Sequence, residues 1–237
     1  VLKHSRGGLK NIPAFARRAL ILNQADTPML QSFAGQMAES LLADYHSVLV
    51  TSLANQPEPV SAVYEKTAAL IFSTAQPGHN LEDNRFVGGI ARKAILAGLD
   101  PVIVVASSLN EEIQNAIAGL PVQFIIPPGG QEGEGAFIRA GIASLPPFCG
   151  GTFMLRLNQP QISVQLLRAM MQHHRQYLPA VLAPYVFDQR STPYLLDRVT
   201  FADLLALQAH AGVREVFSKF SPRYLNWYDR RLLIPVD

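Results

Sequence analysis

Short apolar runs rich in β-branched residues alternate with helix-like patterns along most of this 237-residue chain. The clearest run, residues 101–106 (PVIVVA), is apolar throughout, which is typical of a parallel strand buried on both faces. Residues 29–45 instead carry apolar side chains at helical spacing and follow a Thr27-Pro28 start. Such alternation predicts an α/β fold with a doubly wound, mostly parallel sheet.

The same patterns locate the other elements. We expect strands over residues 18–23, 47–53, 68–72, 101–106, 122–126, 152–157 and 180–187. We expect helices over residues 29–45, 87–97, 109–118, 135–145, 164–177 and 201–209, and extended closing segments over 223–228 and 232–236. Ligands of doubly wound sheets bind beyond the carboxyl ends of the strands, so the loops after the strands are the candidate site.

Composition excludes several classes of protein. Hydrophobic residues make up 49% and charged residues 16% of the chain, which favours a large core over disorder. The net charge of +2 is scattered, so no nucleic-acid partner is expected, and no apolar run reaches the ~20 residues of a membrane span. The single cysteine, Cys149, forms no disulfide within the chain and is expected to be a buried or loop thiol. We expect a cytoplasmic protein, and the first residue, Val1, fits a start inside a longer chain.

Six short motifs follow one another beyond residue 67. In chain order they are 97–101 (AGLDP), 132–142 (EGEGAFIRAGI), 157–160 (LNQP), 192–196 (TPYLL), 212–214 (GVR) and 235–237 (PVD). No motif is specific alone, but their order over about 170 residues resembles that of the MobA-like molybdenum cofactor nucleotidyltransferases. The resemblance implies a domain over 67–237 with the nucleotide-diphospho-sugar transferase (Rossmann-like) fold.

Residues 1–66 resemble a different family. The segment 7–13 (GGLKNIP) and the motif 23–26 (NQAD) are similar to the later part of the selenium-dependent hydroxylase accessory (YqeC-like) family. In related proteins the second motif reads guanine, but no phosphate-binding G-x-x-x-x-G-K-[ST] occurs in this chain. The simpler interpretation is that Asn23 and Asp26 cap a turn between strand and helix. We therefore expect a partial YqeC-like segment over 1–66.

The MobA-like resemblance implies transfer of CMP or GMP from CTP or GTP to a molybdopterin-type phosphate, with Mg²⁺ as cofactor. It also implies a molybdenum hydroxylase as a possible downstream partner. The family supplies a glycine-rich basic loop after its first strand, an Asp after a middle strand and a second Asp near its end. Carboxylate oxygens suit Mg²⁺, and catalysis of this kind depends on positioning and charge neutralisation.

Two of these three features are altered here. The loop position holds 73–80 (STAQPGHN), which contains neither Arg nor Lys, and the resemblance assigns nucleotide binding to four of its residues: Ser73, Thr74, Ala75 and Gly78. Asn158 stands where the family has its first metal-binding Asp, and it brings an amide oxygen without charge. Asp237 matches the late metal-binding Asp.

The best-kept motif is 132–139 (EGEGAFIR). By resemblance, Gly133, Gly135 and Arg139 bind the nucleotide, with the helix that follows directing its amide groups at the ligand. The alternative is a plain entry from loop to helix, with Arg139 in a surface salt bridge. Residues 188–190 (DQR), after a strand end, either line the acceptor pocket or form a simple turn.

Three functional hypotheses therefore remain open from the sequence. The chain is an active nucleotidyltransferase, or it is a catalytically impaired relative that binds a nucleotide, a cofactor or a partner. The third hypothesis concerns the sequence itself: the short loop near residue 76 and the missing N-terminal half of the YqeC-like segment reflect a truncated or edited chain.

Overall fold

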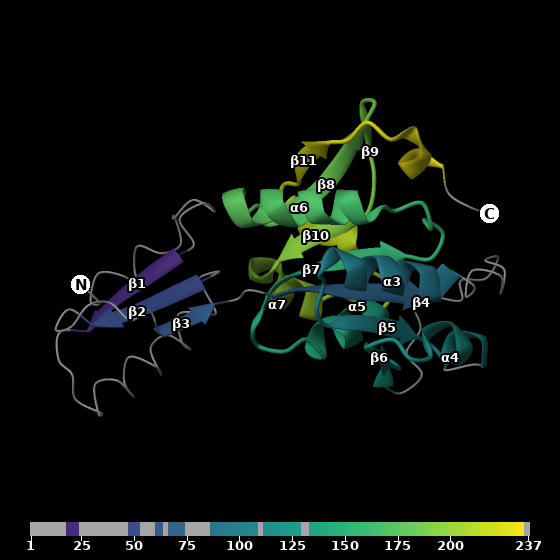
Figure 1. Cartoon of the computed structure of the whole chain (residues 1–237), viewed down its shortest axis with the longest axis horizontal. Coiled ribbons are helices and arrows are strands. Elements are labelled where there is room, and N and C mark those ends of the chain that lie inside the picture. The colour runs from purple at the N-terminus through teal and green to yellow at the C-terminus, as the bar shows by residue number, and fades with distance from the viewer. Residues whose placement is uncertain are drawn as a thin grey trace.

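A computed structural model describes residues 18–23, 47–52, 60–63, 66–73, 86–108, 111–128 and 133–234. For the first three ranges it describes the backbone alone. The chain forms two sheets, one of three strands and one of eight (Figure 1). None of the described helices combines the length and apolar character required to cross a bilayer.

The smaller sheet has the order β1-β2-β3, from β1 (Arg18–Asn23), β2 (Ser47–Ser52) and β3 (Val60–Val63). β1 and β2 are parallel and confirm two predicted strands, whereas β3 is antiparallel to β2 and was not predicted. The helix predicted over 29–45 lies outside the described residues. The assignment of residues 1–66 to a separate YqeC-like segment stays a prediction.

The larger sheet has the order β11-β8-β10-β7-β4-β5-β6, with the short β9 beside β8. Four neighbouring strands are parallel, in the order β7, β4, β5 and β6. β8 and β11 are also parallel to each other, whereas β10 runs antiparallel to both of its neighbours, β7 and β8. The predicted mostly parallel α/β sheet is thus confirmed. Its strands are β4 (Lys66–Ser73), β5 (Val102–Ala106), β6 (Val122–Ile125), β7 (Cys149–Arg156), β8 (Val181–Val186), β9 (Gln189–Arg190), β10 (Tyr194–Asp197) and β11 (Arg223–Asn226).

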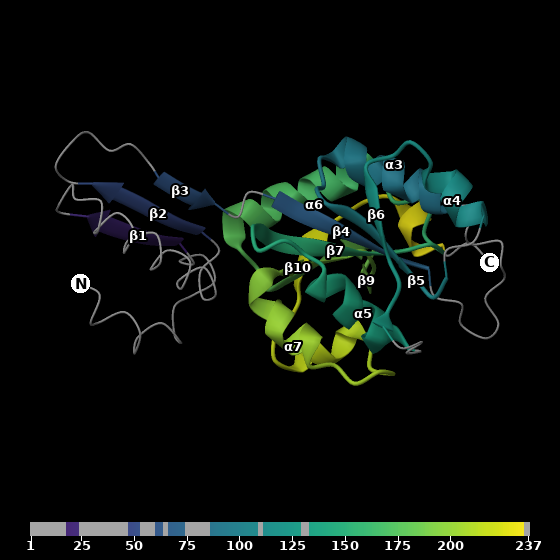
Figure 2. The same cartoon turned by 90° about the horizontal axis from the view of Figure 1, so that it is seen from below.

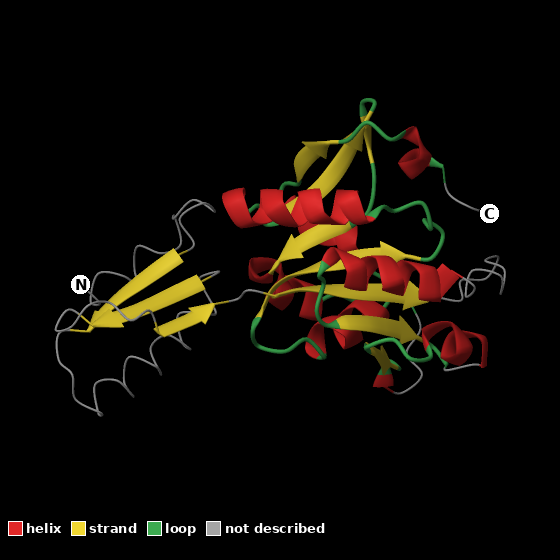
Figure 3. Ribbon diagram, viewed as in Figure 1, coloured by secondary structure: helices red, strands yellow, loops and turns green. Residues whose placement is uncertain are grey.

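Helices cover both faces of this sheet, as Figure 2 and Figure 3 show. On one face α3 (Val87–Ala97), α4 (Glu111–Ile117) and α6 (Val164–Tyr177) pack over a core that includes Phe153 and Leu155. On the other face lie α5 (Glu134–Ala143), α7 (Phe201–Leu205) and the 3₁₀ segment η7 (Val213–Ser218), over a second core. Two further 3₁₀ turns are η6 (Arg198–Thr200) and η8 (Arg230–Leu233).

Two predicted elements differ from the structure. The helix predicted over 201–209 ends at Leu205, and the segment that follows packs on α5 instead, where the carbonyls of Leu207 and Ala209 accept hydrogen bonds from Arg139 and from Ala136 N. The extended segment predicted over 232–236 begins inside η8, where the Asp229 side chain caps the turn by accepting from Arg231 N. The first difference involves contacts with an element distant in sequence, whereas the second is a local cap.

Two side chains of reactive type, Cys149 and His174, are buried in the core. Cys149 opens β7 and is fully buried, and burial raises the pKa of its thiol to about 11. A thiol that stays protonated at neutral pH is a poor nucleophile, so the predicted structural role is the one the structure supports. His174 of α6 is likewise buried, and its Nε2 lies 3.0 Å from Oδ2 of Asp197.

We expect Asp197→Ala to lower the free energy of unfolding by about 2–5 kcal/mol, because each buried polar group left without its hydrogen-bond partner costs about 1–3 kcal/mol. The carboxylate contacts His174 and also accepts a 2.9 Å hydrogen bond from Val199 N, and both groups would be left buried. Urea unfolding measures the loss. The matched control is Asp203→Ala, which breaks an exposed ion pair with Lys219 and should cost less than about 1 kcal/mol. Equal losses in the two variants would contradict the assignment.

Candidate nucleotide-binding edge of the sheet

The carboxyl ends of four parallel strands meet along one edge of the larger sheet. Figure 1 shows β4, β5 and β7 ending on the same side of the molecule. The strand register places Phe72 of β4 beside Arg156 of β7, and Ser73 beside Ala106 of β5. Open parallel sheets bind ligands beyond such an edge, so the candidate site lies here.

The predicted phosphate loop begins at this edge. Ser73 ends β4 and is buried, with only 8% of its surface exposed. Thr74, Ala75 and Gly78 lie outside the described residues. The role of these four residues in nucleotide binding stays a prediction.

Asn158, the predicted metal ligand, follows the end of β7 by two residues. Its Oδ1 atom is buried and has no hydrogen-bond partner within the part of the chain that the structure describes. A buried amide oxygen without a hydrogen-bond partner costs about 1–3 kcal/mol of folding free energy, and such atoms are rare in native proteins. A cation, or a hydrogen-bond donor on a bound ligand, would be a partner for this oxygen.

The loop that carries Asn158 is anchored on three sides. Lys93 of α3 donates a hydrogen bond to the carbonyl of Pro160, and Thr192 donates one to the side chain of Gln159. Gln161 donates from Nε2 to the carbonyl of Ile234.

The last of these contacts concerns the second predicted metal ligand. Ile234 precedes Asp237 by three residues, and Gln161 follows Asn158 by three. The chain therefore approaches its last residues beside the Asn158 loop, although Asp237 itself lies outside the described residues. This approach agrees with the pairing of Asn158 and Asp237 that the sequence predicts, and the pairing stays a prediction.

The glycines of the best-kept motif allow two backbone segments to approach closely. Gly133 has a φ of +104°, and a Cβ atom there would lie 2.4 Å from the carbonyl oxygen of Ala209. At Gly135 a Cβ would lie 2.0 Å from the carbonyl oxygen of Gln208. Arg139 donates from Nη1 to the carbonyl of Leu207 on the same segment. The structure thus gives all three predicted nucleotide-binding residues a packing role, while their binding role stays a prediction.

A charged cluster that the sequence did not predict lies where α5 meets the edge. Nη2 of Arg156 is 2.6 Å from Oε1 of Glu134, the first residue of α5. A hydrogen bond with Tyr194 and the charge of Glu134 raise the pKa of Arg214, at the start of η7. Glu134 therefore interacts with two guanidinium groups. The available sequence signal was Arg156 itself, a cation that ends an apolar strand two residues before Asn158.

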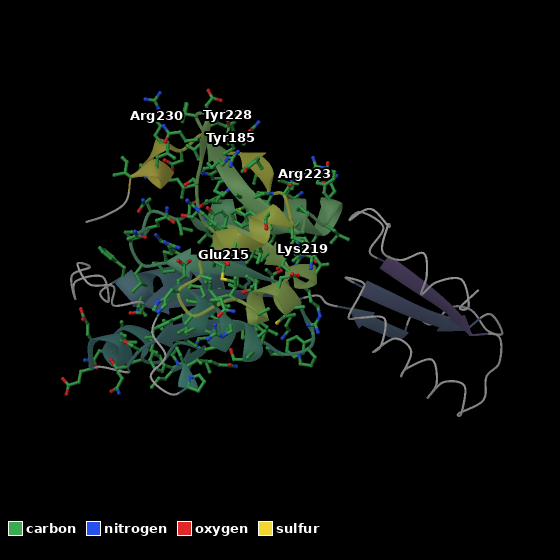
Figure 4. All side chains as sticks on the ribbon, turned by 180° about the vertical axis from the view of Figure 1, so that it is seen from behind. Tyr185, Glu215, Lys219, Arg223, Tyr228 and Arg230 are labelled. Atoms are coloured by element: carbon green, nitrogen blue, oxygen red, sulfur yellow. The ribbon has the colours of Figure 1, made fainter. Side chains whose placement is uncertain are left out.

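Arginines and aromatic rings gather at the carboxyl ends of β8 and β11. The guanidinium carbon of Arg190 lies 5.5 Å from the ring centroid of Tyr224, whose ring is 5.5 Å from that of Tyr185. Arg230 stacks at 4.5 Å on Phe187. Figure 4 shows Tyr185 and Arg230 together at this end of the molecule, away from Glu215 of η7 and from Lys219, the residue after η7. Phe187 and Asp188 adopt positive φ values of 45° and 65°, so residues 188–190 turn from β8 into β9.

Comparison with known proteins decides the family. The family model of the MobA-like NTP transferase domain matches residues 76–224, more than half of the chain. The chain belongs to the MobA-like NTP transferase family. No curated protein matches the sequence.

Solved structures agree with this fold. Rv0371c from Mycobacterium tuberculosis H37Rv is 17% identical, covers 69% of this chain and 89% of its own, and gives a TM-score of 0.59. The complex of Rv0371c with manganese gives a TM-score of 0.57 at 16% identity, with the same coverage. CMP:2-keto-3-deoxy-manno-octonic acid synthetase complexed with CTP gives 0.56 at 9% identity and covers 70% of this chain and 91% of its own. At these identities the likeness establishes the nucleotide-diphospho-sugar transferase fold.

The described residues of the MobA-like domain offer few ligands for a divalent cation. The Asn158 oxygen has the chemistry of one Mg²⁺ ligand, being hard, buried and unpaired within those residues. No group of three or more His, Cys, Asp or Glu side chains in the described ranges could hold a metal ion. Those residues therefore provide one neutral ligand and do not complete a site.

We expect Gly135→Ala to destabilise the MobA-like domain by about 1–3 kcal/mol, because the added methyl group meets backbone that cannot rotate away. The control is Gly89→Ala in the interior of α3, where an added Cβ has nothing within 4 Å. That change should leave stability unchanged or raise it by up to about 1 kcal/mol, following helix propensity. Thermal unfolding of the two variants distinguishes the outcomes. An unchanged melting temperature for Gly135→Ala would show that the close approach is not maintained in solution.

Proposed function

We propose that this chain is a nucleotidyltransferase-like protein of molybdenum cofactor maturation that transfers CMP or GMP to a molybdopterin-type phosphate. The observation that carries the proposal is the Oδ1 atom of Asn158, which is buried without a partner among the described residues. It lies at the carboxyl edge of the sheet, where the family resemblance expects a metal-binding residue. We also propose a cytoplasmic location, which the single buried thiol fits.

The proposed reaction is an in-line substitution at phosphorus. A phosphate oxygen of the acceptor attacks the α-phosphorus of CTP or GTP and forms a new P–O bond. The bond from the α-phosphorus to the bridging oxygen of the β-phosphate breaks, and pyrophosphate leaves with the electron pair. Bound Mg²⁺ would neutralise phosphate charge, with Asn158 and Asp237 as its proposed protein ligands.

The proposed nucleotide contacts lie on both sides of this edge. The loop from Ser73, with Thr74, Ala75 and Gly78, would approach the phosphates from β4. Gly133, Gly135 and Arg139 would hold the nucleotide from the side of α5. Cytidine is one candidate base, because a structural relative is complexed with CTP and another, from Anaerococcus prevotii, is a 4-diphosphocytidyl-2C-methyl-D-erythritol synthase.

The arginine and aromatic side chains of β8, β9 and β11 are the observation that supports a molybdopterin-type acceptor. A planar ring that carries a phosphate can stack on a tyrosine and pair with a guanidinium group. Tyr185, Tyr224 and Arg190 offer both contacts on one face of the sheet. A molybdenum hydroxylase is the proposed recipient of the finished cofactor.

A catalytically impaired relative is the second candidate function, and the charge of the site favours it. Asn158 brings no negative charge, and the segment 73–80 contains neither Arg nor Lys. In this case the protein binds a nucleotide, the cofactor or a partner in hydroxylase maturation without efficient turnover.

Calorimetric titration with CTP, GTP and ATP, with and without Mg²⁺, tests nucleotide binding, which is expected of the active transferase and is one proposed role of the impaired relative. We expect one nucleotide to bind with a Kd in the micromolar range, about −8 kcal/mol for 1 μM. Pyrophosphate release with a pterin phosphate acceptor then separates transferase from impaired relative. Absence of binding by all three nucleotides at millimolar concentration would contradict both.

We expect Asn158→Asp to tighten Mn²⁺ binding by about tenfold or more, because it restores a carboxylate to a buried oxygen position. The amount of free Mn²⁺, followed by electron paramagnetic resonance, measures the affinity. Asn115→Asp on the exposed surface of α4 adds the same charge and should leave the affinity unchanged. An equal effect of both variants would mean that only the net charge matters.

A further inference from the structure

The ion pair of Arg156 and Glu134 lies at the carboxyl edge of the sheet, where the candidate site lies. Arg156 ends β7 and is in register with Phe72, the residue before Ser73. It also precedes Asn158 by two residues. Arg156 is therefore near both the end of β4, from which the proposed phosphate loop begins, and the proposed metal ligand.

Stability does not account for this pair. The Arg156 side chain is 49% exposed and that of Glu134 is 29% exposed. Ion pairs as open to solvent as this one contribute little to folding. Arginine, however, is well suited to phosphate, because its planar donors can bind two oxygens at once.

Other cations of the described residues near this edge are engaged with backbone. Lys93 donates to the carbonyl of Pro160 and Arg139 to that of Leu207. The segment 73–80 contains no Arg or Lys, and Asn158 contributes no charge that would hold a divalent ion. Arg156 differs from Lys93 and Arg139 because its partner is a carboxylate, which another anion can replace.

We propose that Arg156 binds the phosphate chain of the nucleotide, and that Glu134 is the counter-ion which the phosphates displace. The inference rests on the proposed function, since it concerns the same nucleotide site. It makes the guanidinium group of Arg156, rather than a divalent cation, the main source of positive charge for the phosphates.

The position of Glu134 suits a displaceable counter-ion. As the first residue of α5 it lies at the positive end of the helix dipole, so its carboxylate remains favourably placed after Arg156 leaves. A Cβ atom at Gly212 would lie 3.2 Å from its Oε2, so the segment before η7 borders the carboxylate. A triphosphate carries several charges and can accept bidentate hydrogen bonds, which allows it to compete with one carboxylate for Arg156.

The test is calorimetric binding of CTP, GTP and inorganic tripolyphosphate to the full chain, in EDTA and in Mg²⁺. For the wild type we expect tripolyphosphate and the preferred nucleotide to bind in EDTA within about threefold of their affinity in Mg²⁺. Arg156→Gln should weaken both by tenfold or more in EDTA, about the loss of one charge-assisted contact. Glu134→Gln should tighten both by severalfold, because it removes the competing carboxylate.

Arg168→Gln is the matched control. Arg168 is an exposed arginine of α6, on the opposite face of the sheet, and donates to the carbonyl of Leu96. The variant loses the same charge and should bind as the wild type does. Glu134→Gln keeps the inference testable if Arg156→Gln fails to fold, because the two changes have opposite expected signs.

The outcomes separate this inference from the proposed function. Nucleotide binding that requires Mg²⁺ and is unaffected by either variant would overturn the role of Arg156 and leave the proposed function standing. Weaker binding by Glu134→Gln would overturn the role of Glu134 as a displaced counter-ion. Failure of the wild type to bind any nucleotide under either condition would overturn both proposals.

Discussion

The parallel pairing of β4 with β7 is the constraint on which the rest of the structure depends. β4 is an interior strand between β7 and β5, and Ala68, Ala69, Leu70 and Ile71 are entirely buried between the helices of the two faces. Burial on both faces fixes the register, because a slip of one residue would exchange the faces of every side chain. The register in turn brings Phe72 next to Arg156, and so brings the start of the predicted phosphate loop to the Asn158 loop. The geometry of the candidate site is therefore a consequence of packing in the core.

A second constraint acts where α5 begins. The backbone of residues 208–211 lies so close to Gly133 and Gly135 that neither position can accept a side chain. This close backbone contact fixes the orientation of the first turn of α5. Glu134, between the two glycines, therefore points toward Arg156. The glycines thus position a charged residue at the edge of the sheet, whatever further contact they make with a nucleotide. From the sequence alone, one cannot tell whether these glycines are needed for packing or for nucleotide binding.

Much of the fold could be predicted from the sequence, because local signals mark many elements. α3 has its predicted bounds and ends at Gly98, whose left-handed φ of 90° suits glycine, and α6 begins after the capping side chain of Ser163. The predicted strands along β4 to β8 are confirmed for the same reason: each is a compact apolar run. β10 was missed because it has only four residues, and its pairing with β7, about 40 residues earlier in the chain, is not visible in a local pattern. The ion pair of Arg156 and Glu134 was missed because it joins residues 22 positions apart, which only the folded sheet brings together.

Two residues decide the charge at this edge. The family resemblance places a metal-binding Asp at the position of Asn158, which carries no charge, and Arg156 lies two residues earlier at the end of β7. A carboxylate at position 158 would hold a divalent cation more strongly than an amide does. With Asn158 and Arg156 at this edge, more of the positive charge available to a phosphate belongs to the chain itself. A guanidinium group cannot polarise a phosphate as a divalent ion does, but it can hold one. On the proposal that Arg156 binds phosphate, a nucleotide can therefore bind without efficient transfer, and that is the behaviour which distinguishes the impaired relative from the active transferase.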